Sequence, residues 1–299
     1  MNFPYREETQ DLNDKTRQNA AGSFIQLAEA VTHYEIGGNE TGDPVVLVHG
    51  FSVPYFIYDP TFKFLTDAGF RVLRYDLYGR GFSDRPAARY DIELFVNQLT
   101  QLLDALHFTS TGLSAGSRPV NLIGLSMGGL IASTFAVRHP DRVNKLVLID
   151  PSGAGPISLS PMIRLMTLPI VAEAILSLVP AETLIKSGSK DIFDPAHVEH
   201  FMSQFRVQLE YKGFRRAILS TIRNGILGSS IHIYERLGKM DKKVMLLWGH
   251  EDMTVPFEHS ISLRAAIPRV EFHAFENCGH IPHYEKPDEV NPLLLQFLR

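Results

Sequence analysis

The sequence predicts an α/β fold in which helices flank a mostly parallel central sheet. Short apolar runs and helical patterns alternate along most of the 299 residues. Most of the runs are apolar at consecutive positions, which is typical of strands that helices cover on both faces. Because strand and helix alternate, the strands of such a sheet are expected to run parallel.

The predicted strands can be taken in chain order. Residues 31–38 alternate polar and apolar side chains, which indicates an antiparallel edge strand or hairpin before the parallel part. Six apolar runs then predict the remaining strands, and three clear helical patterns lie between them. The runs occupy residues 45–49, 70–76, 120–126, 145–150, 243–249 and 270–275, and the helical patterns occupy residues 95–107, 127–140 and 258–268.

The alternation breaks once, between Asp150 and about Lys239. This stretch is too long for a loop, and it has helical periodicity without a convincing strand. Its helical pieces, at 161–179, 195–210 and 213–226, predict a small helical cap inserted between two strands of the sheet. We therefore expect an N-terminal extension of residues 1–29, an α/β core of residues 30–151 and 239–299, and a helical cap, or lid, of residues 152–238.

Composition argues against several classes of protein. The 29 Lys and Arg residues nearly balance the 33 Asp and Glu residues, so no basic stripe is available and we expect no nucleic-acid partner. The single cysteine, Cys278, excludes an internal disulfide framework and multi-cysteine zinc sites. Residues 1–22 are polar where a secretory signal needs an apolar segment, which predicts a cytoplasmic protein.

The longest apolar stretch outside the strands, residues 161–180, is interrupted by Arg164, Pro169 and Glu173. A helix that spans a bilayer rarely contains such residues. We therefore expect no integral membrane segment, and we interpret the stretch as a buried or cleft-facing pair of helices.

Catalytic side chains are expected at the carboxyl ends of the strands, because ligands of open parallel sheets bind there. The residues at or just beyond these ends include a nucleophile, candidate acids and candidate bases. They are His49, Asp76, Ser126, Asp150, Asp252 and His280.

Ser126 lies in the pattern G-x-S-x-G between a predicted strand and a predicted helix. In that context the pattern indicates a nucleophile elbow, a sharp turn that exposes the serine hydroxyl at the edge of the sheet. Gly124 and Gly128 suit the turn, because neighbouring backbone would approach too closely for a Cβ atom. The N-terminus of the following helix would favour developing negative charge beside the serine.

A serine hydroxyl becomes a good nucleophile when a base removes its proton and an acid orients that base. Ser126, Asp252 and His280 occur in the chain order that this architecture needs, each at the end of a predicted strand. Neighbouring residues of the same types stay open as alternatives: Glu251 and Asp150 as the acid, and His283 and His250 as the base.

Taken together, these motifs resemble the α/β-hydrolase superfamily of serine hydrolases, from about residue 30 to the C-terminus. Beyond the elbow, the resemblance rests on four stretches in the same order as in that superfamily. They are HGF at 49–51, YDLYGRGFSDRP at 75–86, WGHEDMTVP at 248–256 and GHIPHYEKPDEV at 279–290.

The resemblance implies an α/β-hydrolase fold with Ser126 as nucleophile, Asp252 as acid and His280 as base. It also implies an oxyanion hole formed by the main-chain amides of Phe51 and Met127, each contributing about 2.7 to 4 kcal/mol. This chemistry needs neither a metal ion nor an organic cofactor. Supporting roles are implied for four neighbours of the nucleophile and of the oxyanion loop: His49, Gly50, Gly124 and Gly128.

Several other polar residues have structural interpretations. We expect His49 to brace the oxyanion loop through hydrogen bonds and not to carry a proton in the reaction. The charged turn around Asp76, Arg80 and Asp84 is interpreted as scaffolding, and Cys278 as a small buried filler.

The predicted reaction is hydrolysis of a carboxylic ester through an acyl-enzyme. Haloalkane dehalogenases and soluble epoxide hydrolases resemble the chain in plan, but they attack with an aspartate at the elbow, where this chain has Ser126. The apolar sequence of the cap favours an acyl chain over a charged group. We expect small-molecule esters with short to medium acyl chains, or monoacylglycerols, as substrates of a carboxylesterase or monoacylglycerol lipase-like enzyme.

Three alternatives stay open. Carbon–carbon bond hydrolases of ring-cleavage products resemble the chain in triad order and capped architecture, but they usually carry a Gly-rich loop after the HG, where this chain reads HGFSVPYFIYDP. A cofactor-free perhydrolase or haloperoxidase would use the same triad, and a small-molecule receptor on the same fold would keep it. The sequence also leaves the acyl preference and the oligomeric state open.

Overall fold

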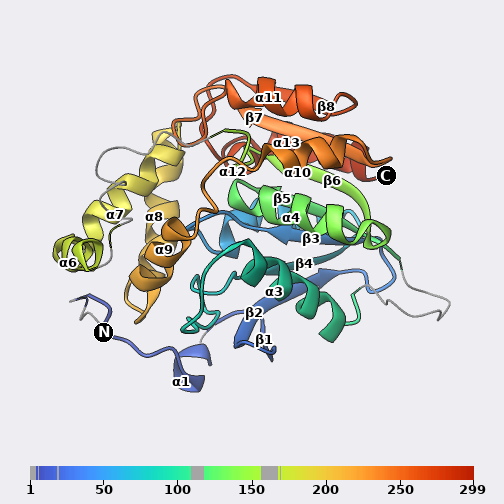
Figure 1. Cartoon of the computed structure of the whole chain (residues 1–299). Helices are drawn as coiled ribbons and strands as arrows, with labels where there is room; N and C mark the ends of the chain where they lie inside the picture. The colour runs from blue at the N-terminus through green and yellow to red at the C-terminus, as the bar shows by residue number, and fades with distance from the viewer. Residues whose placement is uncertain (1–4, 6, 19, 109–117, 156–167, 169) are drawn as a thin grey trace.

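A sheet of eight strands runs through the part of the chain that the structure describes (Figure 1). The computed structural model describes residue 5 and residues 7–18, 20–108, 118–155, 168 and 170–299. The strands lie side by side in the order β1-β2-β4-β3-β5-β6-β7-β8. In chain order they are β1 (Ser23–Gln26), β2 (Val31–Gly38), β3 (Pro44–Val48), β4 (Arg71–Tyr75), β5 (Val120–Leu125), β6 (Val143–Ile149), β7 (Lys243–Gly249) and β8 (Glu271–Phe275).

The sheet is mostly parallel, as the sequence predicts. The strands from β4 across the sheet to β8 pair in parallel, whereas β2 pairs antiparallel with both β1 and β4. The alternating segment 31–38 therefore forms an antiparallel hairpin with β1. β1 itself is too short, at 4 residues, to show a pattern in the sequence. Its place at the edge means that the sheet begins before residue 30.

Two clusters of buried apolar side chains fill the layers on either side of the sheet. Along β3, Val46 and Val48 belong to one cluster, whereas Val45 and Leu47 belong to the other. Both faces of the strand are therefore covered, and this explains why its sequence is apolar at consecutive positions.

Helices of the core divide between the two faces. Side chains of α3 (Ile92–Ala105), α4 (Met127–Arg138), α10 (Ile231–Gly238) and α11 (His259–Ala266) belong to the first cluster. Side chains of α2 (Asp59–Asp67), α12 (Pro282–Glu285) and α13 (Pro287–Leu298) belong to the second. Three short elements, α1 (Asp14–Arg17), η1 (Tyr55–Tyr58) and η2 (Pro140–Arg142), complete the core and the N-terminal segment.

The patterns that we used do not predict α2 and α13. For α13 the sequence does hold a signal, because Pro287 opens the helix and Asp288 and Glu289 lie in its first turn. A proline at the first position and acidic residues after it are typical of helix N-termini.

Further helices lie between β6 and β7. In the described residues they are α6 (Val171–Leu178), α7 (Ala181–Gly188), the short η3 (Ser189–Asp191), α8 (Pro195–Leu209), α9 (Phe214–Arg223) and α10. The predicted pieces at 195–210 and 213–226 correspond to α8 and α9. Of the piece at 161–179, residues 161–167 and 169 lie outside the described residues, and the rest contains α6. None of the described helices combines the length and apolar character that crossing a bilayer requires.

We refer to residues 170–223, from α6 to α9, as the insert. Figure 1 shows its four helices together on one side of the sheet. By contrast, α10 contacts α4 and α11, and its Tyr234 and Leu237 are buried in the first core cluster. The structure therefore places α10 in a layer of the core, although it falls within the predicted cap range 152–238. Helical periodicity is the same for a helix in either place, so the sequence could not separate them.

Aromatic contacts hold α8 against the core. Asp194 caps the helix, since its side chain accepts a hydrogen bond from the Ala196 amide at 2.9 Å. Further along the helix, the ring of Phe201 lies 5.6 Å from that of Phe56 and 5.7 Å from that of Tyr284. Since Phe56 follows β3 and Tyr284 follows β8, α8 lies beside the carboxyl ends of these strands.

Candidate active site

Ser126 is the residue at which β5 ends and α4 begins. Its φ of 53° and ψ of −119° lie outside the regions that non-glycine residues usually adopt. Its amide donates to Ile149 O at 2.8 Å, and its carbonyl accepts from the amides of Gly129 at 2.9 Å and Ser152 at 3.1 Å. These main-chain bonds hold the sharp turn that the G-x-S-x-G pattern predicts.

The glycines of the pattern are needed for close approach of the backbone. A Cβ atom added to Gly124 would lie 2.4 Å from Gly128 O, and one added to Gly128 would lie 2.1 Å from Val48 O. A Cβ atom on Gly129 would lie 2.7 Å from Pro151 Cβ. Because main-chain atoms cannot move aside cheaply, the first two positions exclude any larger residue.

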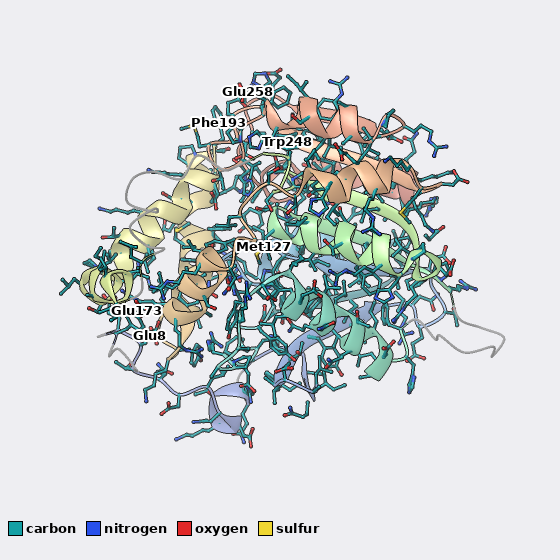
Figure 2. The ribbon with its side chains drawn as sticks, viewed as in Figure 1. Glu8, Met127, Glu173, Phe193, Trp248 and Glu258 are labelled. Atoms are coloured by element: carbon teal, nitrogen blue, oxygen red, sulfur yellow. The ribbon has the colours of Figure 1, made fainter. Side chains whose placement is uncertain are left out.

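The main-chain amides of Phe51 and Met127 have no hydrogen-bond acceptor among the described residues. Met127 is the first residue of α4, where helix N–H groups have no intrahelical partner, and Figure 2 labels it near the centre of the molecule. A Cβ atom on Gly50 would lie 3.3 Å from Ser126 Cβ, so the loop after β3 passes beside the serine. Two unoccupied donors thus flank the nucleophile, as an oxyanion hole requires.

Side chains from the core brace this oxyanion loop. His49 is fully buried; its Nε2 accepts from the Leu77 amide at 2.8 Å, and its Nδ1 lies 2.9 Å from Gly50 O. Burial lowers the pKa of His49 to about 4, so the ring is neutral at physiological pH. Arg80 donates from Nε to Phe51 O at 2.7 Å. Both residues act on the shape of the loop and leave its amide free.

The insert reaches the same loop. Gln208, on α8, donates from Nε2 to Ser52 O at 2.6 Å and accepts from the Gly81 amide at 3.1 Å. Arg80 donates from Nη2 to the hydroxyl of Thr221, on α9, at 2.9 Å. The position of the oxyanion loop is therefore coupled to two helices of the insert.

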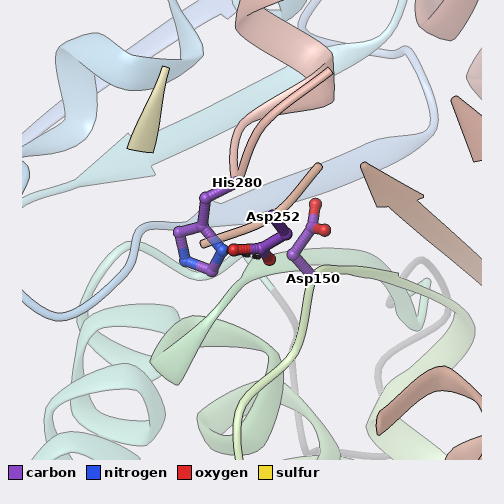
Figure 3. A group of neighbouring side chains, drawn as sticks. All are labelled: Asp150, Asp252 and His280. Carbon is purple, nitrogen blue, oxygen red and sulfur yellow. Dashed lines mark hydrogen bonds and ion pairs between the residues drawn. The ribbon is translucent and has the colours of Figure 1, made fainter. Parts of the chain in front are cut away.

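His280 and Asp252 form a buried pair beyond the ends of β8 and β7 (Figure 3). His280 Nδ1 lies 2.7 Å from Asp252 Oδ2, and the other carboxylate oxygen accepts from the amides of Thr254 at 2.7 Å and Val255 at 2.9 Å. With Nδ1 engaged, Nε2 is the nitrogen left for a reacting group. No hydrogen bond joins Ser126 Oγ to His280 among the described side chains, and such bonds are often long in unliganded sites.

Three carboxylates act on the charge of His280. Burial disfavours the imidazolium, but the charge and hydrogen bond of Asp252 outweigh it, so the pKa of His280 is raised above its ordinary value. The charges of Asp191 and Glu285 act in the same direction. The site therefore stabilises a histidine that has taken up a proton.

A further acid, Asp150, directly follows β6 and lies beside this pair (Figure 3). Its Oδ1 accepts from the Gly249 amide at 2.9 Å, whereas its Oδ2 has no partner among the described residues. Burial, followed by the charge of Asp252, raises the pKa of Asp150 well above its ordinary range. Ligand atoms of Asp150, Asp252 and His280 lie within 4.8 Å of one another, a spacing that suits a metal ion. The pairing of His280 Nδ1 with Asp252 instead suits acid–base chemistry.

The other residues weighed as acid or base are engaged elsewhere. Glu251 accepts from the Cys278 amide at 2.9 Å, and Cys278 is fully buried. Burial lowers the pKa of His283 to about 3, and its ring packs 4.7 Å from that of Tyr58. His250 is half-exposed and lies 3.7 Å from Glu251 Oε1. None of these contacts resembles the pair that His280 makes.

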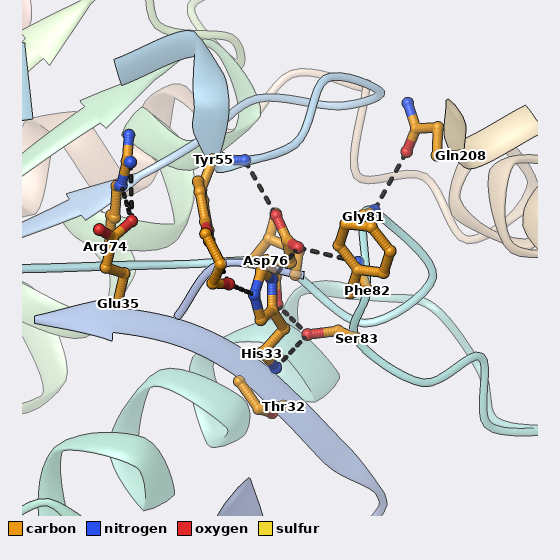
Figure 4. A network of polar contacts seen from close by, with 12 residues as sticks. Thr32, His33, Glu35, Tyr55, Arg74, Asp76, Gly81, Phe82, Ser83 and Gln208 are labelled. Carbon is orange, nitrogen blue, oxygen red and sulfur yellow. Dashed lines mark hydrogen bonds and ion pairs between the residues drawn. The ribbon is translucent and has the colours of Figure 1, made fainter. Parts of the chain in front are cut away.

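Asp76 is the centre of a separate polar network (Figure 4). It accepts from His33 Nδ1 at 2.7 Å and from the amides of Tyr55 and Phe82, each at 2.9 Å. A Cβ atom on Gly81 would lie 2.0 Å from Asp76 Oδ2. The network supports the scaffolding interpretation of this turn. A cavity of about 360 Å³ beside it contains no residue of the predicted triad.

Two carboxylates near His280 were not singled out by sequence reasoning. Glu285 lies within the quoted stretch GHIPHYEKPDEV, but nothing in that stretch gives it a role. Asp191 follows α7 in a helical region, where no local pattern points to the site. Only the folded chain brings them to the base.

Comparisons with known proteins identify the family of this fold. The family model that matches residues 45–293 is described as the alpha/beta hydrolase family. Among curated proteins, the 2-hydroxy-6-oxo-6-phenylhexa-2,4-dienoate hydrolase of Comamonas testosteroni is 28% identical over 305 residues, which cover 97% of this chain and 99% of that protein.

Solved structures of other hydrolases share the fold. A meta-cleavage product hydrolase from Pseudomonas fluorescens IP01 is 25% identical, with a TM-score of 0.75 and coverage of 93% of this chain and 97% of that chain. An esterase from Exiguobacterium antarcticum is 20% identical, with a TM-score of 0.76 and coverage of 93% and 99%. The second likeness is informative about the fold alone.

Proposed function

This chain belongs to the alpha/beta hydrolase family, and from that premise we propose that it hydrolyses a carbon–carbon bond beside a ketone in a ring-cleavage product. The observation that carries the proposal is the extent of likeness to the dienoate hydrolase of Comamonas testosteroni, which covers 97% of the chain. A span of that size includes the insert as well as the core. The likeness thus favours the carbon–carbon alternative over the ester hydrolysis that the sequence motifs favour.

Ser126 is the nucleophile of the proposed reaction, and His280 is its base. For a 2-hydroxy-6-oxo dienoate, transfer of a proton from the 2-hydroxyl to C5 gives a 2,6-diketone. Ser126 Oγ then attacks C6 while Nε2 of His280 takes the serine proton. The amides of Phe51 and Met127 stabilise the negative charge on the C6 oxygen.

Collapse of this intermediate breaks the C5–C6 bond. The electron pair passes from C5 along the conjugated chain to the 2-oxygen, which takes the proton from His280 and leaves as a 2-hydroxydienoate. The acyl group stays on Ser126. Water activated by His280 then releases it as a carboxylate, so that one water is consumed in each turnover.

We also propose that the insert serves as a lid over this site. Three contacts support this proposal: α8 holds Ser52, α9 holds Arg80, and the His280 amide donates to Asp191 O at 2.8 Å. A lid connected to both the oxyanion loop and the base would exclude water from the reacting carbonyl.

Ester hydrolysis is the second candidate, and one observation favours it. The loop after His49 and Gly50 begins with Phe51, Ser52 and Val53, whereas carbon–carbon hydrolases of this superfamily usually have a Gly-rich loop there. An ester needs the same nucleophile, base and oxyanion donors, and its leaving alcohol takes the proton from His280.

A comparison of kcat/KM between substrates tests the proposal. Purified protein is given 2-hydroxy-6-oxo-6-phenylhexa-2,4-dienoate, and loss of the dienoate absorbance and release of benzoate are followed together. p-Nitrophenyl butyrate and a monoacylglycerol are measured in parallel. We expect kcat/KM for the dienoate to exceed that for either ester by at least about tenfold.

Ser126→Ala is the control for every substrate, and it should abolish turnover of all of them. The opposite order of kcat/KM, with esters preferred, would replace the proposal by the second candidate. If the protein turned over none of the substrates and no fluorophosphonate labelled it, the hydrolase assignment itself would fail.

A further inference from the structure

One segment of the insert lies directly on the loop that carries His280. The amide of His280 donates to Asp191 O at 2.8 Å. A Cβ atom added to Gly279 would lie 2.6 Å from Asp191 O and 3.0 Å from Phe193 N. The insert therefore approaches this loop so closely that only glycine fits at position 279.

Glu285, on α12, ties the two segments together. Its Oε1 accepts from the Gly279 amide at 2.9 Å, and its Oε2 accepts from the amides of Phe193 at 2.7 Å and Asp194 at 2.9 Å. Figure 2 labels Phe193 where the helices of the insert meet the C-terminal part of the sheet. One buried carboxylate thus satisfies three main-chain donors, two from the insert and one from the base loop.

The side chain of Asp191 contacts the acid loop as well. Thr254 Oγ1 donates a short hydrogen bond to Asp191 Oδ1. The amide of the same threonine donates to Asp252 Oδ1 at 2.7 Å. Asp191 therefore holds the loop of the acid through its side chain and the loop of the base through its main chain.

We propose that Asp191 is a positioning residue for the acid–base pair: it joins the loops of Asp252 and His280, and it adds a negative charge beside the imidazole. The proposal rests on the proposed function in one respect, namely that His280 acts as the base for Ser126. Under this proposal, His280 acts as an efficient base only when residues 191–194 of the insert are packed against its loop.

The charges around His280 fit this role. Asp252, on the loop after β7, makes the hydrogen bond to the ring, and the charges of Asp191 from the insert and Glu285 from α12 also favour the imidazolium. Asp150, from the end of β6, lies beside Asp252, and burial raises its pKa well above its ordinary range, which favours the neutral acid. His283 is kept neutral by burial. Burial raises the pKa of Asp191 itself, whereas the charge of His280 and the hydrogen bond from Thr254 lower it. Replacement of Asp191 therefore tests whether its carboxylate is one of those that favour the imidazolium.

The rate at which a fluorophosphonate labels Ser126 provides the test, because this reaction needs the base but no particular substrate. The second-order rate constant is measured against pH in the wild type and in four variants: Asp191→Ala, Asp191→Asn, Thr254→Val and Thr254→Ser. Each profile yields a plateau rate, which reports the geometry of the pair, and a midpoint, which reports the pKa of His280.

We expect Asp191→Ala to lower the plateau at least about tenfold and to move the midpoint to lower pH. Asp191→Asn keeps an oxygen that can accept from Thr254, so it should restore most of the plateau, yet its midpoint should stay below that of the wild type. Thr254→Val should lower the plateau without moving the midpoint. Thr254→Ser keeps the hydroxyl and should behave like the wild type.

Glu199→Gln is the matched control, because Glu199 is an exposed carboxylate of the same insert and should change neither quantity. Wild-type plateaus in both Asp191→Ala and Thr254→Val would overturn the positioning role, and the second variant decides the question if the first does not fold. An unchanged midpoint in Asp191→Asn would overturn the contribution of charge. A wild type that the probe does not label would instead contradict the proposed function.

Discussion

His280 Nδ1 lies 2.7 Å from Asp252 Oδ2, and the other oxygen of Asp252 accepts from the amides of Thr254 and Val255. Both oxygens of Asp252 are thus engaged, and these bonds hold its side chain in one orientation. The proton of His280 is thereby placed on Nδ1, and the lone pair of Nε2 is left for the serine.

Replacement of Asp252 by asparagine should remove this control. The amide side chain can bond His280 in the wrong tautomer, so we expect kcat to fall on the order of 10³- to 10⁴-fold, with little loss of stability. Steady-state kinetics and thermal unfolding would measure both effects. Asp150→Asn is the matched control, because it changes a neighbouring acid that makes no hydrogen bond to His280 among the described residues. A near-normal rate in Asp252→Asn, with a large loss in Asp150→Asn, would transfer the role of acid to Asp150.

The acid side of the pH–rate profile should report the same pair. Because Asp252, with Asp191 and Glu285, raises the pKa of His280, the midpoint of kcat/KM should lie above about 6.5, the ordinary value for histidine. Activity should be lost as the pH falls through this midpoint, since a protonated His280 cannot accept the serine proton. A midpoint below 6 would show that burial, and not the carboxylates, dominates at this ring.

The close backbone contact at Gly128 of the elbow should contribute to the free energy of unfolding, which can be measured separately from catalysis. In Gly128→Ala the new Cβ atom would lie 2.1 Å from Val48 O, so β3 and α4 must move apart. We expect a loss of about 3 kcal/mol or more in the free energy of unfolding, measured by urea denaturation. Gly188→Ala is the control: its φ is −68°, and the nearest atom to a new Cβ is Met202 Cε at 3.6 Å. That variant should be neutral or slightly more stable.

The difference between what the sequence predicts and what it misses follows from the range of the interactions. Strands such as β3 and β7 are buried on both faces, and the unbroken apolar runs that result are visible locally. The elbow and its glycines are local as well, because Gly124, Ser126 and Gly128 act on one turn. For these parts the sequence was sufficient.

Contacts between segments that are distant in the sequence produce no local sequence pattern. Asp191 reaches His280 across 89 positions of the chain, and its neighbours in sequence show only a helical pattern. Whether α10 lies in the core or in the insert depends on which surface covers its apolar side. Helical periodicity in the sequence is the same in both cases. The sequence motifs also do not determine the substrate, because hydrolysis of an ester and of a 2-hydroxy-6-oxo dienoate would use the same nucleophile and base.

The N-terminal segment offers the last prediction, because it holds the start of α9. Glu8 is buried, and its carboxylate accepts from the amides of Gly213 at 2.6 Å and Arg215 at 2.7 Å. Burial raises the pKa of Glu8, although the two main-chain bonds oppose the shift. The residue therefore acts as a helix cap supplied from far away in the sequence.

Glu8→Ala would leave both amides without that acceptor. We expect a loss of about 1 to 3 kcal/mol in the free energy of unfolding, with faster hydrogen exchange confined to α9 and its neighbours in the insert. Glu210→Ala is the control, because Glu210 also joins the insert to the N-terminal segment, through Gln10, but does so at the exposed surface. This variant should lose less than about 0.5 kcal/mol in the free energy of unfolding.

Because Arg80 bonds Thr221 on α9 and Phe51 in the oxyanion loop, Glu8→Ala should also lower kcat more than it raises KM. Equal exchange rates in α9 of the two variants would show that the cap does not stabilise the insert.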